Sequence, residues 1–151
     1  MTAVLFLASI GFAWCQLNQM KLERQWINFN EMNLRYADML REITSNDYSK
    51  CDLNETNKIW TRRYFNLYSE EYWLYEKKLI PEEMWKDRIR PGVVVNLKEY
   101  PWLIKGYRYW RDKGAFSHPN GFYDIVKEDI SNAEQDGLYS PCADQARDQT
   151  K

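Results

Sequence analysis

The stretch from Tyr64 to Ile80, YFNLYSEEYWLYEKKLI, constrains the fold more than any other part of this 151-residue chain. At about 100° per residue, one broad half of a helix gathers nearly all of its apolar side chains. Trp73 falls alone on the polar half. A face this wide is expected of a helix that packs against two neighbours. The sequence therefore predicts a helical bundle, with an aromatic face made of Trp60, Tyr64, Tyr68, Tyr72 and Tyr75.

Further helices are indicated on both sides of this stretch. A stripe of apolar residues at spacings of three and four, from Phe29 to Ile43, predicts an earlier helix that ends near Ile43. The segment Asp52–Glu55 has the pattern of a capping box, which opens the aromatic helix. A proline at the first turn followed by two glutamates, in Ile80–Glu83, predicts the start of a third helix.

The remaining segments are punctuated by proline and glycine. Arg90–Gly92 is expected to end or kink the third helix, and the β-branched run that follows reads as a helix or an extended connector. Residues 100–114 predict a helix that closes at Gly114. A last helix is expected, with its inward face made of Phe122, Ile125, Val126 and Ile130.

The first twenty residues carry no charged side chain. A membrane-spanning helix needs roughly 20 residues, with a lower bound of about 17, so this apolar segment is close to spanning length. Three interpretations compete: a short membrane anchor, a secretory signal peptide that lacks the basic start such peptides need, and a buried core helix. We favour the anchor, which assigns residues 1–20 to the membrane, 21–133 to a helical domain and 134–151 to a disordered tail.

The charges that flank the anchor predict its orientation. Lys21 and Arg24 follow it directly and nothing positive precedes it. Positive charge is retained on the cytoplasmic side, so we expect a single-pass protein of the inner membrane with its domain in the cytoplasm. Three cysteines without CxxC spacing fit a reducing compartment and predict neither a zinc site nor a disulfide framework: Cys15, Cys51 and Cys142.

Glu71 is the one polar residue that projects into the aromatic face, and Lys78 shares its side of the helix. A buried carboxylate needs a partner or a raised pKa. Glu71 is therefore either a group that contacts a ligand or transfers a proton, or, as we favour, a structural group bonded to a tyrosine or an arginine.

No other pattern points to catalysis, a cofactor or a metal. His118 is the only histidine, and Asp124, Glu128 and Asp129 read as a solvated helix face. The net charge of −1 gives no reason to expect nucleic acid. The basic and aromatic run from Lys105 to Lys113 could face a membrane or RNA, but reads better as a bundle helix with snorkelling cations.

Two segments, RRYFNLYSEEYWLYEKKLIPEEMW and YPWLIKGYRYW, follow the apolar start. Together they resemble a family of small bacterial membrane-anchored helical proteins of unknown function, over residues 1–133. The carriers of the resemblance are Tyr64, Phe65, Tyr72, Leu79, Ile80, Glu82 and Trp85. The resemblance implies an all-α fold and transfers no catalytic residue.

We therefore expect an all-α protein in which a membrane helix continues into a bundle of about four or five helices. The favoured function is a non-enzymatic interaction or scaffold protein, whose partners are the membrane and an unidentified protein. The alternative is a small-ligand or lipid-binding domain that uses the aromatic face. A binding domain should leave part of this face lining a cavity, whereas a scaffold should bury it fully.

Overall fold

The computed structural model describes residues 2–45, 53–116 and 120–135. In this part of the chain every regular element is helical, which confirms the predicted all-α class. The elements are α1 (Thr2–Ser45), α2 (Glu55–Glu76), α3 (Glu82–Met84), η1 (Trp85–Ile89), α4 (Arg90–Glu99), α5 (Trp102–Asp112) and α6 (Phe122–Gln135). If α3, η1 and α4 are taken as one continuous helix, the described residues form five helices, within the range expected.

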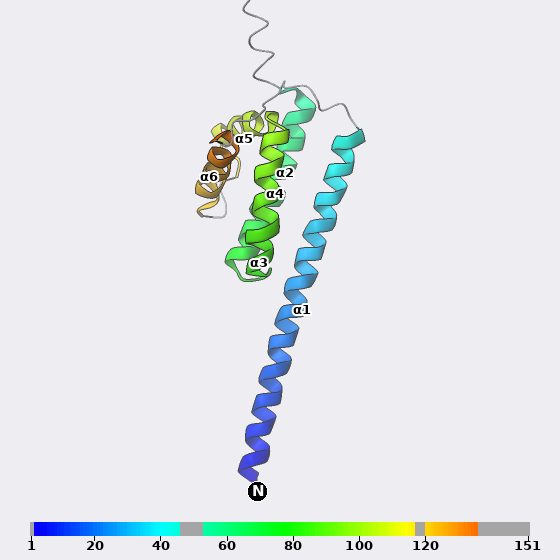
Figure 1. The fold of residues 1–151 in the computed structure, drawn as a ribbon, viewed down its shortest axis with the longest axis vertical. Coiled ribbons are helices and arrows are strands. Elements are labelled where there is room, and N and C mark those ends of the chain that lie inside the picture. The colour runs from blue at the N-terminus through cyan, green and yellow to red at the C-terminus, as the bar shows by residue number, and fades with distance from the viewer. Residues whose placement is uncertain (1, 46–52, 117–119, 136–151) are drawn as a thin grey trace, which may run out of the picture.

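Helix α1 is much longer than the bundle it joins (Figure 1). Its second half packs on α2 through the predicted stripe, in which Met32, Met39 and Ile43 are buried and Phe29 and Tyr36 are partly buried. Two ion pairs tie the helices together, Arg35 to Glu70 at 2.8 Å and Arg63 to Glu42 at 2.6 Å. The stripe of apolar residues therefore correctly predicts which face of the second half of α1 packs on the bundle.

The first half of α1 leaves the bundle as a single helix. Residues 9–24, which we call the N-terminal arm, are all exposed, and Gln25 is the next position along the helix and is buried. Residues 9–20 of this segment therefore do not form a buried core helix. The predicted membrane anchor is not supported either, because no helix within the described ranges is long and apolar enough to cross a membrane.

The aromatic face of α2 forms the centre of the bundle. Trp60, Tyr64, Tyr68 and Tyr72 are buried and Tyr75 is half-buried, whereas Trp73 is 43% exposed, as its place on the polar half predicts. The rings contact aromatic residues from three other elements. Trp60 lies against Trp102 of α5, Tyr68 stacks on Trp85 of η1, and Tyr72 contacts Phe122 of α6.

Helix α5 crosses α2 at very short range because a glycine lies at the crossing point. A Cβ atom added to Gly106 would come within 2.8 Å of the Thr61 Cβ atom. Thr61 is itself fully buried, and its hydroxyl donates a hydrogen bond to the Asn57 carbonyl at 2.7 Å. The residue at position 106 therefore has to be glycine for the two helices to approach this closely.

Two local expectations need correction. Helix α2 is capped by Asn54, whose side-chain oxygen accepts the Asn57 N–H at 2.8 Å, so the cap lies two residues after Asp52, which is outside the described residues. Lys78 does not share a helix face with Glu71, because α2 ends at Glu76 and Lys78 adopts a left-handed conformation with φ of 55°.

The segment around Pro91 neither ends the third helix nor forms an extended connector. Proline lacks an N–H donor, and its ring crowds the turn that precedes it. The turn before it widens into a π-helix over Trp85–Ile89, in which the Arg90 N–H donates to the Trp85 carbonyl. The chain then continues as α4 through the valine run.

We expect two tryptophans of α2 to differ sharply when each is replaced by alanine. Trp60→Ala empties a site that is 2% exposed and should lower the free energy of unfolding by about 3–5 kcal/mol. Trp73→Ala changes a surface position and should cost less than about 1 kcal/mol. Denaturant unfolding of both variants measures the difference, and equal costs would show that the helix faces are assigned wrongly.

Candidate functional site

Glu71 lies where α1, α2 and α4 meet. It is 8% exposed, as expected for a residue inside the aromatic face. Neither predicted structural partner is present: among the described residues, no hydrogen bond or ion pair reaches its carboxyl group. Arg35 is near enough to act through its charge, but its guanidinium pairs with Glu70 instead.

Burial raises the pKa of Glu71 to about 8. The positive charge of Arg35 opposes this rise, and the negative charge of Glu70 adds to it. The carboxyl group is therefore largely protonated at neutral pH, when it can donate as well as accept a hydrogen bond.

A cavity of about 100 Å³ opens beside this carboxyl group. It is lined from α1 by Phe29, Asn33 and Tyr36, from α2 by Tyr64, Leu67, Tyr68 and Glu71, and from η1 and α4 by Arg88, Ile89, Gly92, Val93 and Asn96. Part of the predicted aromatic face therefore lines a cavity, and Trp60, Tyr72 and Tyr75 lie outside it.

Asn96 organises the polar side of this cavity, although nothing in the sequence marks it as special. It is buried on α4, and its side-chain nitrogen donates to the Tyr64 hydroxyl at 2.9 Å and to the Tyr36 hydroxyl at 2.7 Å. Burial raises the pKa of both tyrosines, so both rings remain neutral at physiological pH. One amide therefore holds two walls of the cavity together.

A second buried polar cluster lies on the other side of Tyr68. Asp129 of α6 is fully buried, so its assignment to a solvated helix face is wrong. It accepts a hydrogen bond from the Tyr68 hydroxyl at 2.6 Å and one from Arg90 Nε at 2.8 Å. Arg90 also pairs with Glu128 at 2.7 Å. Because its donors come from α2 and α4, this carboxylate ties three helices together.

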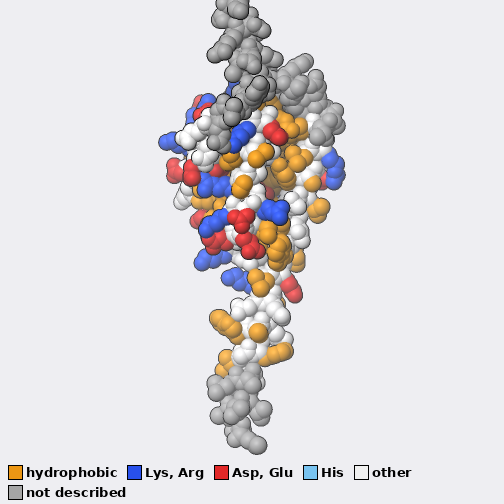
Figure 2. Space-filling view, viewed as in Figure 1, with side chains coloured by type: hydrophobic (Ala, Val, Ile, Leu, Met, Phe, Trp, Pro, Cys, Tyr) orange, Lys and Arg blue, Asp and Glu red, His pale blue; other side chains and the backbone are white. Residues whose placement is uncertain are grey.

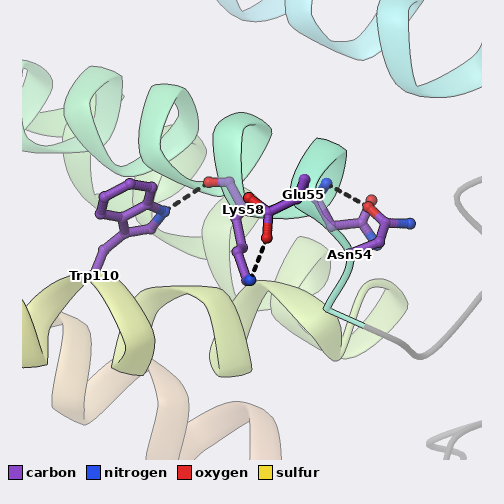
Figure 3. A network of polar contacts seen from close by, with 5 residues as sticks. Asn54, Glu55, Lys58 and Trp110 are labelled. Carbon is purple, nitrogen blue, oxygen red and sulfur yellow. Dashed lines mark hydrogen bonds and ion pairs between the residues drawn. The ribbon is translucent and has the colours of Figure 1, made fainter.

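The basic and aromatic residues of α5 contact one another and the start of α2. The Trp110 indole N–H donates to the Lys58 carbonyl at 2.7 Å, and Lys58 pairs with Glu55 at 2.6 Å (Figure 3). The Lys58 ammonium also lies 4.8 Å from the centre of the Tyr109 ring. These contacts agree with the interpretation of this segment as a bundle helix.

The structure offers no metal centre in the part of the chain it describes, where no three His, Cys, Asp or Glu side chains gather. Cys15 is exposed on the N-terminal arm. His118, Cys51 and Cys142 lie outside the described residues.

The Asp129 cluster should contribute to stability. Asp129→Ala leaves Arg90 and the Tyr68 hydroxyl without their acceptor and should lower the free energy of unfolding by about 3 kcal/mol. Asp124→Ala, an exposed change on the same helix, should cost less than about 1 kcal/mol. Chemical unfolding measures both, and a cost as small for Asp129 as for Asp124 would contradict the structural role.

Glu71 should make the protein less stable as the pH rises. Between the ordinary glutamate pKa of 4.5 and its folded value of about 8, the folded protein holds a proton that the unfolded chain has lost. The free energy of unfolding should therefore fall from pH 5 to pH 8, by on the order of 3 kcal/mol.

Unfolding measured at pH 5 and pH 8 tests this expectation. Glu71→Gln cannot ionise and should lose most of the pH dependence, whereas Glu99→Gln, at an exposed position of α4, should retain it. Identical pH profiles for the wild type and Glu71→Gln would show that Glu71 is ionised in the folded protein.

Comparisons with known proteins identify no relative of this chain. No family model, no curated protein and no solved structure matches the chain. The resemblance to small bacterial membrane-anchored proteins therefore stays a prediction.

Proposed function

We propose that the protein is a non-enzymatic interaction protein, attached to a lipid bilayer by its N-terminal arm and presenting its bundle to a protein partner. The observation that carries this proposal is the arm itself, a helical segment whose large apolar side chains are exposed. Six of them are more than half exposed: Ile10, Phe12, Trp14, Leu17, Met20 and Leu22. Soluble surfaces rarely display this many large apolar side chains on one short segment unless something covers them.

The distribution of these side chains around the helix favours lipid over a protein groove. At about 100° per residue, Ile10, Trp14 and Leu17 fall within one narrow sector, and Phe12 lies roughly opposite. A groove on a partner protein covers one stripe of a helix, whereas a bilayer covers all sides. Figure 2 shows hydrophobic and uncharged side chains on the visible face of the lowest described part of the arm.

The charges of the arm mark where it would leave the lipid. Residues 9–20 carry none, and Lys21, Glu23 and Arg24 follow within four positions. The bundle begins directly after them, at the buried Gln25. Retention of positive charge on the cytoplasmic side supports an orientation in which the bundle faces the cytoplasm at the inner membrane.

A second candidate function, small-ligand binding, is supported by one separate observation. The cavity beside Glu71 is lined by three members of the aromatic helix, Tyr64, Tyr68 and Leu67. A pure scaffold has no need of an opening in its aromatic core.

Attachment to lipid predicts that the full-length protein floats with vesicles of phosphatidylcholine and phosphatidylglycerol and stays bound at high salt. Phe12→Asp combined with Trp14→Asp should abolish flotation, because each charge costs about 2.5–3.5 kcal/mol near the bilayer centre.

The matched control adds the same two charges to exposed apolar positions of the bundle. Ile59→Asp combined with Val95→Asp should leave flotation unchanged, since both side chains are about as exposed as those of the arm. Flotation of the arm variant, or loss of binding in high salt, would rule out the proposed mode of attachment. A salt-resistant oligomer without vesicle binding would show instead that another protein chain covers the arm.

A further inference from the structure

The cavity beside Glu71 is built from three helices that meet around a carboxyl group to which no described residue is hydrogen-bonded. Its α1 wall contributes Phe29 and Tyr36, its α2 wall Tyr64 and Leu67, and its α4 wall Val93, with other residues between them. Most of the lining is therefore apolar or aromatic. Small-molecule sites combine such a lining with a few convergent polar groups that fix the ligand's orientation.

The polar side chains of the cavity differ in whether they have hydrogen-bond partners. Both donors of Asn96 are directed at tyrosine hydroxyls, those of Tyr36 and Tyr64. Glu71 has no hydrogen-bond partner among the described residues, although more than nine-tenths of its surface is buried. The Glu71 oxygens are not among the fully buried side-chain atoms that lack a partner, so they are accessible to solvent. The Glu71 carboxyl is thus a vacant acceptor that faces the cavity.

The cavity is accessible from solvent between α1 and the third helix. Its exposed lining residues are Asn33 on α1 and Arg88 on η1, which mark the opening. Gly92 lies beside it on α4, where an added Cβ would meet no atom within 4 Å. Glycine inside a helix is less favourable than alanine, and no close packing at this position requires it. The absence of a side chain at position 92 keeps the opening wide.

We propose that this cavity binds a small organic amine as its ammonium ion, with the nitrogen against the Glu71 carboxylate and the hydrocarbon part against the aromatic and aliphatic walls. This inference rests on the second candidate function and is independent of attachment to lipid.

The chemistry of the lining selects an ammonium ion over other ligands. An ammonium group supplies the N–H donors that Glu71 lacks, and aromatic rings attract a cation that lies near their faces. Once Glu71 is ionised it repels an anion, and a metal ion would find only one carboxylate among the lining residues. The volume of about 100 Å³ is smaller than the engineered 150 Å³ cavity that holds benzene, so it suits a chain of a few carbon atoms.

The charged and titratable groups around Glu71 predict how binding depends on pH. From α1, Arg35 favours the carboxylate; from α2, Glu70 disfavours it; and Arg88 of η1 lies at the opening. Three tyrosines also line the cavity, Tyr36, Tyr64 and Tyr68, and their raised pKa values keep them neutral. Glu71, whose pKa is about 8, must lose its proton to receive an ammonium ion. Affinity should therefore rise about tenfold per pH unit below pH 8 and level off above it.

Three matched probes with one hydrocarbon chain test the proposal: n-butylammonium, n-butanol and butyrate. Each is titrated into the full-length protein in detergent micelles. The methyl NMR signals of Ile89 and Val93 report binding, because both residues line the cavity. Local, saturable shifts separate binding in the cavity from partition into the micelle. We expect n-butylammonium to bind at least tenfold more tightly than n-butanol at pH 9, and butyrate not to bind.

Two pairs of variants complete the test. Glu71→Gln should weaken n-butylammonium at least tenfold, since a hydrogen bond to a charged group is worth about 1.5–3 kcal/mol, and should remove the dependence on pH. Gly92→Leu should block the opening and abolish binding. Gly92→Ala should bind as the wild type does, because a Cβ at this position meets nothing.

The outcomes separate the class of ligand from the existence of a site. Equal binding of n-butanol and n-butylammonium, lost in Gly92→Leu, would overturn the amine as ligand and keep the cavity as a binding site. The absence of saturable shifts with any probe would overturn both, and would mean that the cavity holds water only. Binding that is unaffected by Gly92→Leu would place the ligand elsewhere.

Discussion

The aromatic side chains of α2 need more cover than any one neighbouring helix can supply, and the other elements are arranged to provide it. Trp60 is covered by Trp102 of α5, Tyr68 by Trp85 of η1 and Phe122 of α6. Rings this large bury 150–250 Å² each, so a helix that carries them on half of its surface is stable only when surrounded. Pro81, Pro101 and Gly121 each lie shortly before a residue that covers these rings, namely Trp85, Trp102 and Phe122.

Covering a tyrosine also buries a hydroxyl group, and the bundle meets this cost with polar residues from distant parts of the chain. Asp129 accepts from Tyr68 across 61 residues, and Asn96 donates to Tyr64 across 32. Asp129 and Asn96 are therefore buried, although they are polar, because each is the hydrogen-bond partner of a buried tyrosine hydroxyl. Glu71 lies in the same face, but its carboxyl group receives no such partner from the described residues. The hydroxyls of Tyr64 and Tyr68 thus find their hydrogen-bond partners within the fold, whereas the Glu71 carboxyl is left able to bond a ligand.

Much of this arrangement follows from local sequence, and the rest follows from how helices cross. The faces of α1 and α2, the buried Trp60 and the exposed Trp73 could be predicted because helical periodicity alone decides them. The burial of Asp129, the role of Asn96 and the cavity beside Glu71 could not, because each depends on which residue of another helix lies opposite. The π-helical turn before Pro91 was equally hidden, since a proline predicts disruption without specifying how the chain absorbs it.

Helix α1 links the arm to the bundle, and the join is made by hydrogen bonds as well as by apolar packing. Gln25 donates to the Lys78 carbonyl at 2.8 Å and Asn28 to the Leu79 carbonyl at 2.9 Å, at the turn where α2 ends. These carbonyls have left the helical ladder, so the two side chains satisfy acceptors that would otherwise need water. One turn further along, Phe29 and Asn33 of the same uninterrupted helix form a wall of the Glu71 cavity. Any surface that holds the arm therefore acts on a helix that also shapes the cavity, and the bonds from Gln25 and Asn28 fasten this helix to the end of α2 between the arm and the cavity.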